Sequence, residues 1–206
     1  NKMEIVKREG VFRFDETTEK ESHWTVDFAD DDLFGFCFMG QLAQEELLCL
    51  EHPGLYHLRK ALVAKQHNEL KDDEIALVRG VKRYSALDTS KKGVDGKTLY
   101  GNNFRDAIKE QIDSCLTIFD DPKESQIVAM VAPRKGLYSG PTYDKDDLEK
   151  YFYRAYAAFS ASKGNSNGKK AVIHTGNWGC GSFGNSYHVA ALTQLVAARI
   201  AQVDQF

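Results

Sequence analysis

The sequence predicts an α/β fold in which a sheet with substantial parallel pairing is flanked by helices. Short apolar runs alternate along the chain with segments of helical periodicity, which is typical of parallel strands joined by helices. Three of the four apolar runs are nearly continuous in aliphatic residues, as expected for strands that helices cover on both faces. The length of 206 residues suits one domain over residues 1–206 with a sizeable core.

The elements follow in order along the chain. The expected strands are residues 25–29, 75–78, 127–131 and 171–173. The expected helices are residues 41–50, which Pro53-Gly54 ends, 55–66, 148–159 and 189–203. Asp144 or Asp146 is expected to cap the helix over 148–159. Residues 89–96 and 163–170, rich in Lys, Gly, Ser and Asn, are expected to be exposed loops.

Composition excludes several classes of protein. A net charge of −3 argues against a broad basic face that grips nucleic acid, so no direct nucleic-acid partner is expected. The apolar runs are far shorter than the ~20 residues of a membrane span, so no membrane partner is expected. The chain opens at Asn1 without a signal-like segment, so we expect it to be trimmed or processed, and its localisation cannot be read from this end.

The four cysteines, Cys37, Cys49, Cys115 and Cys180, have no Cys-x-x-Cys spacing and no matching histidines. A reducing, intracellular compartment is therefore the simpler expectation than an extracellular one. Cys49 and Cys115 lie among aliphatic residues and are interpreted as small core residues. Trp24, Trp178 and His174 are interpreted as packing or supporting residues, and the other histidines form no motif.

A glycine-rich segment, Thr175-Gly176-Asn177-Trp178-Gly179-Cys180-Gly181-Ser182-Phe183-Gly184, lies between a predicted strand and a predicted helix. Such a turn can present backbone N–H groups and a helix dipole to a phosphate or diphosphate. The alternative is a tight connection whose glycines serve only for turning. No Gly-Lys-Ser/Thr ends the segment, which argues against a nucleotide kinase.

An acidic segment reads Val26-Asp27-Phe28-Ala29-Asp30, then Phe34-Gly35-Phe36, then Gln44-Glu45-Glu46. Taken alone, acidic residues in the first turn of a helix need no ligand, because they favour the helix dipole. Consecutive helical side chains diverge by about 100°, so Glu45 and Glu46 can each reach a different part of one ligand.

Together the two segments resemble the poly(ADP-ribose) glycohydrolase family. That family's pattern is Val-Asp-Phe-Ala-Asn, three residues, three glycines, seven residues and Gln-Glu-Glu, and residues 26–46 match it in length without a gap. Its diphosphate loop, Thr-Gly-Asn-Trp-Gly-Cys-Gly-Ala-Phe-Gly, is similar to residues 175–184, with Ser182 in place of alanine. The resemblance extends from about Val26 to Val203.

The resemblance implies a three-layer α/β/α macrodomain-like fold that binds ADP-ribose or an ADP-ribosylated protein or polymer and hydrolyses the bond at the distal ribose. By position, Glu46 matches the catalytic acid, and Glu45 matches its partner that holds a ribose hydroxyl. No cofactor and no metal are implied. The implied ligand-binding residues are Asp27, Asp30, Gly35, Gln44, Asn177, Gly179, Cys180, Gly181, Ser182, Phe183 and Gly184.

Chemistry agrees with the implied roles. Cleavage at the anomeric carbon builds oxocarbenium character and needs a proton on the leaving oxygen, which a partly buried carboxyl group can deliver before it takes a proton from water. We expect Glu46 to do this, while the glycine-rich loop holds the diphosphate and positions the sugar.

Departures from the family pattern leave three hypotheses open. Phe34 and Phe36 replace two glycines, and two phenyl rings there are expected to change the shape of the pocket or block it. Asp30 replaces an asparagine, so an ionised carboxylate that only accepts hydrogen bonds stands where an amide could donate one. The leading hypothesis is an ADP-ribosyl hydrolase. The alternatives are an ADP-ribose reader that does not cleave and a partner-binding degenerate macrodomain.

Overall fold

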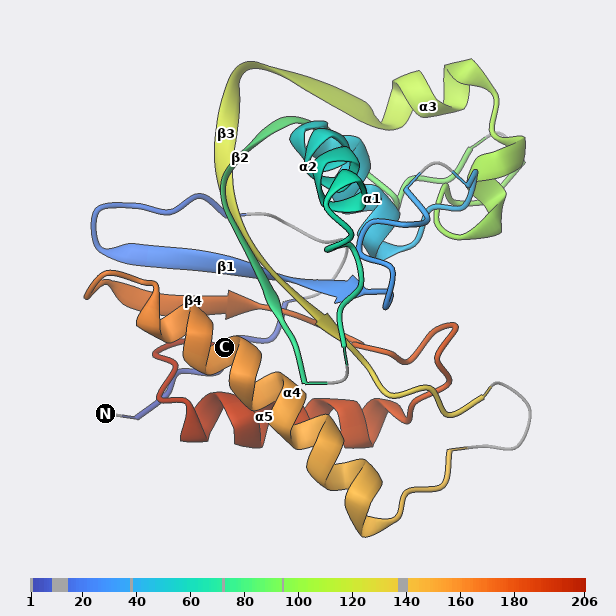
Figure 1. The fold of residues 1–206 in the computed structure, drawn as a ribbon. Coiled ribbons are helices and arrows are strands. Elements are labelled where there is room, and N and C mark those ends of the chain that lie inside the picture. Colours follow the sequence, from blue (N-terminus) through green and yellow to red (C-terminus); the bar gives the residue numbers. More distant parts are fainter. Residues whose placement is uncertain (1, 9–14, 38, 72, 94, 137–140) are drawn as a thin grey trace.

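The computed structural model describes residues 2–8, 15–37, 39–71, 73–93, 95–136 and 141–206. Its centre is a four-stranded sheet in the order β2-β3-β1-β4 (Figure 1). The strands are β1 (Glu21–Ala29), β2 (Ala76–Leu87), β3 (Leu116–Val131) and β4 (Lys170–His174). Strand β1 pairs in parallel with both β3 and β4, whereas β2 is antiparallel to β3.

Helices cover both faces of this sheet (Figure 1). On one face α1 (Gln44–Glu51) and α2 (Gly54–Ala64) pack through Leu48 and Leu55 against Ala29 of β1. On the other face lie α4 (Lys145–Gly164) and α5 (Tyr187–Ile200). The connection from β2 to β3 holds the 3₁₀ helix η1 (Asn102–Asp106) and α3 (Lys109–Cys115). The predicted three-layer α/β/α fold with a mixed sheet is confirmed.

Strand register determines where the loops emerge. Thr25 of β1 lies opposite Ile127 of β3 and His174 of β4, so three parallel strands run side by side in one direction. Their carboxyl ends meet at one edge of the sheet, where α/β proteins commonly bind ligands. The segments that follow β1, β3 and β4 therefore all start at this edge.

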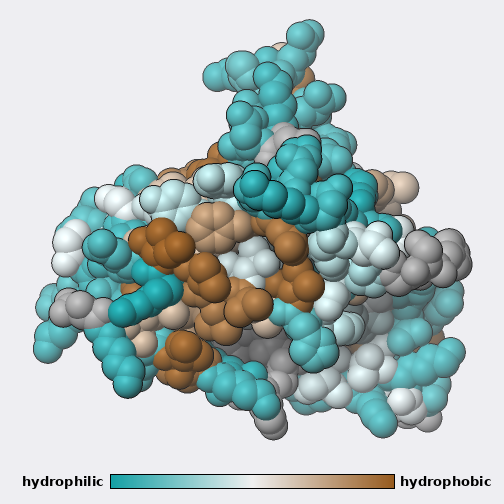
Figure 2. All heavy atoms as spheres, turned by 90° about the horizontal axis from the view of Figure 1, so that it is seen from below, coloured by the Kyte–Doolittle hydropathy of each residue, from teal (hydrophilic) through white to brown (hydrophobic). Residues whose placement is uncertain are grey.

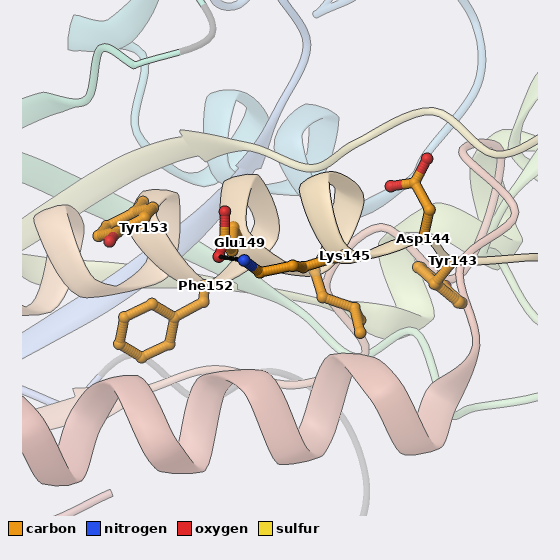
Figure 3. Close-up of a pocket in the computed structure, with 7 residues that line it drawn as sticks. Tyr143, Asp144, Lys145, Glu149, Phe152 and Tyr153 are labelled. Carbon is orange, nitrogen blue, oxygen red and sulfur yellow. Dashed lines mark ion pairs between the residues drawn. The ribbon is translucent and has the colours of Figure 1, made fainter.

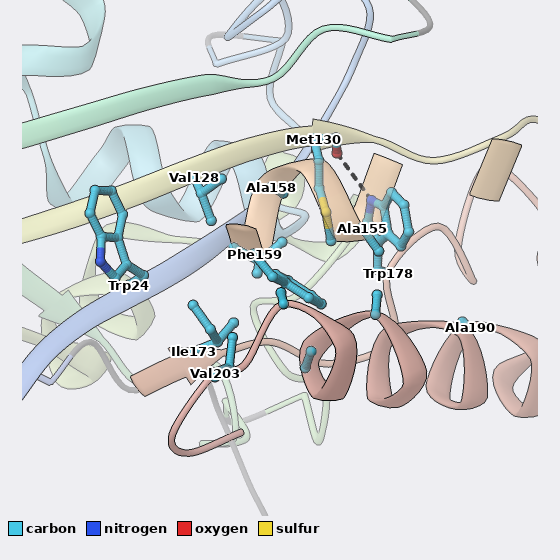
Figure 4. Close-up of a cluster of buried hydrophobic side chains, with 14 of the residues drawn as sticks. Trp24, Val128, Met130, Ala155, Ala158, Phe159, Ile173, Trp178, Ala190 and Val203 are labelled. Carbon is cyan, nitrogen blue, oxygen red and sulfur yellow. Dashed lines mark hydrogen bonds between the residues drawn. The ribbon is translucent and has the colours of Figure 1, made fainter. Parts of the chain in front are cut away.

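The larger core cluster lies between the sheet and α4/α5 and contains both tryptophans (Figure 4). Trp24 and Trp178 are fully buried, which confirms the packing role expected for them. The Trp178 indole Nε1 donates a hydrogen bond to the Met130 carbonyl at 3.0 Å. This contact holds the glycine-rich segment against the carboxyl end of β3.

The predicted strands and helices are all present, and the main differences are in length. Strands β2 and β3 extend far beyond the predicted 75–78 and 127–131, because their outer halves form an antiparallel ladder that mixes exposed and buried residues and has no continuous apolar run. Helix α4 begins earlier than predicted, and Asp144 is its cap, since its Oδ1 accepts a hydrogen bond from the Asp147 N–H at 2.8 Å.

The cysteines correct one expectation. Cys49 is buried as predicted, and it is also bonded to Cys37 in a disulfide, which the expectation of a reducing compartment did not foresee. The chain after β1 folds back over α1 and brings the two Cα atoms to 5.9 Å. Spacing along the sequence did not reveal this return. Cys115, predicted to be a small core residue, is free and buried.

Apolar side chains gather on the outer surface of α4 and α5 (Figure 2). On α5, Leu192, Val196 and Ile200 follow one another at four-residue steps and are exposed. Within the described ranges, no helix combines the length and the apolar character needed to cross a membrane.

Candidate active site

The first motif begins at the carboxyl end of β1, where α1 is fixed by Gln44. The Gln44 side-chain amide donates to the Val26 carbonyl at 2.8 Å, and its oxygen accepts from the Phe28 N–H at 2.7 Å. Both ends of the amide are thus used within the protein. Gln44, predicted to bind ligand, holds the first turn of α1 against β1 and so positions the two glutamates that follow it.

Three carboxyl groups lie together between β1 and α1. Asp27 is fully buried, and neither of its carboxyl oxygens has a hydrogen-bond partner among the described residues. Burial, reinforced by the negative charge of Glu46, raises the pKa of Asp27 to about 8. Burial and the nearby Asp27 raise the pKa of Glu45 to about 10. The carboxyl groups of Asp27 and Glu45 are therefore protonated at neutral pH.

Glu45 and Glu46 make different contacts. One oxygen of Glu45, Oε1, accepts a hydrogen bond from the Phe34 N–H at 2.9 Å, which ties Glu45 to the loop after β1. Oε2 of Glu46 accepts from the Ala43 N–H at 2.9 Å, so this carboxyl group satisfies the N–H of the residue that precedes α1. Burial raises the pKa of Glu46 as well. Its other oxygen, Oε1, makes no hydrogen bond to another residue in the described part of the chain.

The loop after β1 carries the two phenylalanines that replace glycines. The Phe34 ring is fully buried and packs with Leu48 and Leu55 in the α1/α2 core, which differs from the expectation that both rings stand in the pocket. Phe34 adopts a left-handed φ of 59°, a conformation that glycine takes more readily. Phe36 is 45% exposed. Gly35 is required here, because a Cβ atom would lie 2.5 Å from an Asp32 carboxylate oxygen.

The glycine-rich segment is a series of turns with unused donors. Gly181 and Ser182 are exposed, and no acceptor in the described part of the chain meets the N–H groups of Gly181, Ser182 or Phe183. Gly179 is needed for close packing, since its Cβ would lie 2.3 Å from that of Ala132. A Cβ on Gly181 would meet no atom within 4 Å. Turning and packing therefore do not explain Gly181, whereas an approaching anion would.

The two remaining predicted polar residues of this segment are placed differently. Asn177 is exposed at the surface of the segment. Cys180 uses both of its donors internally, with its N–H on the Asn177 carbonyl at 3.0 Å and its thiol 3.7 Å from the Trp178 carbonyl. Burial raises the pKa of the Cys180 thiol, which keeps it protonated.

Residues that sequence reasoning missed hold this segment in place. The Asn185 amide donates to the Pro133 carbonyl at 2.6 Å and to the Gly179 carbonyl at 3.0 Å. Tyr151 of α4 donates its hydroxyl hydrogen to the Trp178 carbonyl at 2.7 Å. These contacts join parts of the chain that are distant in sequence, so periodicity and local motifs gave no signal for them.

Arg134, also missed, connects the two motifs. Its guanidinium group lies 3.9 Å from the centre of the Phe183 ring and donates to an Asp30 carboxylate oxygen at 2.8 Å. The glycine-rich segment and the acidic segment thus meet at the same edge of the sheet. This juxtaposition brings unused N–H donors, a cation and protonated carboxyl groups into one region.

Comparison with known proteins identifies the family of the chain. The model of the family described as poly(ADP-ribose) glycohydrolase (PARG), macro domain fold, matches residues 7–205. The chain belongs to this family. Poly(ADP-ribose) glycohydrolases with solved structures share its fold. The poly(ADP-ribose) glycohydrolase from Thermomonospora curvata is 17% identical, with a TM-score of 0.57. The match covers 89% of this chain and 60% of the Thermomonospora curvata chain.

Two further structures in the family have ligands in their descriptions. The Deinococcus radiodurans poly(ADP-ribose) glycohydrolase in complex with ADP-ribose is 21% identical, with a TM-score of 0.54 over 89% of this chain and 66% of its own. The Thermomonospora curvata protein bound to the inhibitor ADP-HPD is 18% identical, with a TM-score of 0.53 over 84% of this chain and 56% of its own. The present chain thus spans less than two thirds of these poly(ADP-ribose) glycohydrolases.

A separate cavity of about 470 Å³ lies on the surface of α4 (Figure 3). It is lined by Leu148, Phe152 and Tyr153, together with the ion pair between Lys145 and Glu149 at 3.4 Å. None of the predicted site residues of this poly(ADP-ribose) glycohydrolase family member lines it. The cavity is therefore distinct from the region where the two motifs meet.

Proposed function

We propose that this chain is an ADP-ribosyl glycohydrolase that releases ADP-ribose from poly- or mono-ADP-ribosylated substrates. The observation that carries the proposal is the juxtaposition through Arg134 of the unused N–H donors after β4 and the carboxyl groups between β1 and α1. A diphosphate is the anion that suits the N–H donors after β4. A sugar attached to this diphosphate can reach the carboxyl groups between β1 and α1.

In the proposed mechanism Glu46 acts as the acid and then as the base. Burial raises the pKa of Glu46, which favours the protonated form, and in this proposal Oε1 carries the proton because Oε2 accepts from the Ala43 N–H. Proton transfer from Glu46 to the leaving oxygen accompanies cleavage of the bond at the anomeric carbon, where oxocarbenium character develops. The resulting carboxylate accepts a proton from the water that attacks this carbon, which restores the acid for the next cycle.

The other acidic residues have supporting roles in this proposal. Glu45 holds the loop after β1 through the Phe34 N–H and presents its second oxygen to a ribose hydroxyl. Asp27, without a partner and protonated at neutral pH, keeps the region from accumulating negative charge beside an anionic ligand. Asp30 neutralises Arg134 until a diphosphate competes for the guanidinium group.

The experiment compares wild-type protein with Glu46→Gln, and uses Glu149→Gln on the exposed surface of α4 as a matched control. Release of ADP-ribose is measured by mass spectrometry from polymer, arginine-linked and serine-linked substrates, and calorimetry measures ADP-ribose binding. We expect Glu46→Gln to lose about 10²- to 10⁴-fold in rate and to keep its affinity for ADP-ribose. Glu149→Gln should match the wild type.

Other outcomes contradict the proposal in distinguishable ways. Equal rates for Glu46→Gln and wild type would remove the catalytic assignment. Binding of ADP-ribose with no hydrolysis of the three substrates would identify a reader. A folded wild-type protein that neither binds nor cleaves would identify a partner-binding macrodomain without a ligand.

A further inference from the structure

A second cluster of polar side chains lies on the sheet, apart from the region described above. Side chains alternate along β1, and because Trp24 and Val26 face α4 and α5, His23 points to the opposite face. His174, the last residue of the adjacent strand β4, points to that same face because Ile173 enters the α4/α5 core. Asp15, in the segment that precedes β1, meets both histidines.

The geometry of this cluster suits one shared ion. Nδ1 of His23 lies 2.8 Å from Nε2 of His174, and Asp15 Oδ2 lies 3.9 Å from the same His174 nitrogen. One ligand atom from each residue falls within 4.8 Å of the other two. Ligand atoms bound at about 2.0–2.1 Å to a tetrahedral metal lie somewhat over 3 Å apart, so shifts below about 1 Å would complete the site.

Neighbouring residues orient the first histidine. Nε2 of His23 lies 3.2 Å from a Glu21 carboxylate oxygen, and Glu21 is itself held by the Lys170 ammonium group at 3.1 Å. A proton on Nε2 is favoured by this carboxylate, so the lone pair of Nδ1 points toward His174. A carboxylate on the outer nitrogen of a histidine ligand is the usual arrangement around protein-bound zinc.

We propose that Asp15, His23 and His174 form a binding site for a divalent transition metal of the zinc class. Two imidazole nitrogens and one carboxylate oxygen are a donor set that Zn²⁺ prefers and that Mg²⁺ and Ca²⁺ do not. Binding at Nε2 of His174 requires that ring to carry its proton on Nδ1, which is a change of tautomer of the neutral ring. Water or a further donor supplies the fourth position.

Arg8 allows the direction of a change in metal affinity to be predicted and tested. Its guanidinium group donates to Asp15 Oδ2 at 2.6 Å, and its side chain is 46% exposed. A metal ion must compete with this cation for the same carboxylate oxygen. Removal of Arg8 should therefore strengthen metal binding, whereas a purely structural histidine pair would be indifferent to it.

The location suggests what the metal does. Asp15 belongs to the segment before β1, whereas His23 and His174 belong to two adjacent strands, so one ion would fasten that segment to the sheet. His174 is followed directly by Thr175, the first residue of the glycine-rich segment. The site lies about 13 Å along β1 from Asp27, and its occupancy should stabilise the fold without contacting the carboxyl groups between β1 and α1.

The experiment uses the full chain after removal of metal with a chelator. Zn²⁺ is titrated by calorimetry at fixed pH, its stoichiometry is measured by mass spectrometry of the metal, and Co²⁺ serves as a spectroscopic probe. We expect one equivalent of Zn²⁺, a rise in Tm on binding and visible Co²⁺ absorption of tetrahedral intensity.

Variants assign the ligands. His23→Gln and His174→Gln should each weaken Zn²⁺ binding more than about 10²-fold, and Glu21→Gln by about tenfold, because a direct ligand contributes more than its orienting partner. Arg8→Ala should tighten binding. His57→Gln, an exposed histidine on α2, is the matched control and should bind as the wild type does.

Circular dichroism checks that each variant is folded. Asp15→Asn, outside the sheet, keeps the test decisive if a histidine variant fails to fold, since it should also lose Zn²⁺ affinity. Absence of saturable Zn²⁺ binding by the wild type would overturn the proposal. So would wild-type affinity in Asp15→Asn or in a folded histidine variant, or weaker binding in Arg8→Ala.

Discussion

Helix α1 carries buried carboxyl groups at both ends, and the protein treats them in opposite ways. At the carboxyl end, Glu51 is 1% exposed, accepts from Arg83 Nε at 2.8 Å and accepts from the Leu87 N–H at 2.7 Å. At the amino end, Glu45 and Glu46 face Asp27, whose oxygens have no partner in the described part of the chain. One carboxylate is paired with a cation, whereas the others are crowded together.

The difference separates a structural use of a buried acid from a chemical one. A buried charge is costly unless a counter-ion and hydrogen bonds compensate it, which Arg83 and Leu87 do for Glu51. Burial raises the pKa of Glu51 as well, but Arg83 and the Leu87 N–H act in the opposite direction. Asp27 and Glu45 have no such cation to compensate burial, and their pKa values rise to about 8 and about 10. Glu51 thus joins α1 to β2, while the opposite end of the helix holds protons that a reaction can use.

The largest effect on stability is expected from breaking the compensated pair. Glu51→Ala leaves the guanidinium group of Arg83, which is 9% exposed, without this carboxylate, and the Leu87 N–H without its acceptor. We expect the free energy of unfolding to fall by about 3–5 kcal/mol in urea denaturation. Glu46→Gln is the control on the same helix and should change it by less than about 1 kcal/mol, because no cation is left behind.

If Glu51→Ala is too unstable to study, Glu51→Gln can replace it. The glutamine keeps an acceptor for the Leu87 N–H, so this variant should lose less of the free energy of unfolding. A comparable loss for Glu46→Gln and the Glu51 variants would contradict the distinction between the two ends of α1.

The carboxyl groups at the amino end of α1 should affect how the stability of the protein depends on pH. Burial raises the pKa of Asp27 to about 8 and that of Glu45 to about 10, so the folded protein keeps protons that the unfolded chain releases above about pH 4. The unfolded state then binds fewer protons, and stability falls as the pH rises from 5 toward 8. Asp27→Asn should make this slope shallower by about 1.4 kcal/mol per pH unit below pH 7.

Urea denaturation at several pH values measures the slope. Asp113→Asn, an exposed residue of α3, is the matched control and should leave the slope unchanged. If the free energy of unfolding depends on pH with the same slope in wild type and Asp27→Asn, Asp27 is not a protonated buried group.

The disulfide tests whether the two ends of α1 are independent. Cys37–Cys49 ties the loop after β1 to the last turn of the helix, and its reduction should lower the free energy of unfolding by about 2–3 kcal/mol. Hydrogen exchange should increase at the Phe34 N–H that Glu45 holds, and stay unchanged at the Leu87 N–H that Glu51 holds. The variant Cys37→Ser should be insensitive to reductant, and equal loosening at both N–H groups would show that the ends respond together.

Sequence reasoning found the parts of this molecule that are coded locally. The apolar runs at 127–131 and 171–173 mark the inner parts of β3 and β4, and each motif lies within one short segment, so both could be recognised without knowing their neighbours. Contacts between residues that are far apart in the sequence could not be recognised in this way. His23 and His174 are 151 residues apart, and Arg134 lies in no motif although it touches both.

The direction of individual side chains was equally hidden. Phe34 was expected to alter the pocket, but its left-handed backbone conformation turns the ring into the core of α1 and α2. Gln44 looks like a ligand-binding residue in sequence, whereas its amide is bonded at both ends to β1. Both outcomes depend on which neighbouring element supplies the partner, and that is decided only when the layers pack.

The smallest effect is expected from Arg134, and it sharpens the comparison with Arg83. Both arginines pair with carboxylates, but the Arg134 side chain is 52% exposed, so solvent weakens its ion pair with Asp30. Arg134→Ala should change the free energy of unfolding by less than about 1 kcal/mol in urea, against several for Glu51→Ala. A loss above about 2 kcal/mol would mean that Arg134 holds the two motifs together as a structural brace, and the cation would then be unavailable to a diphosphate.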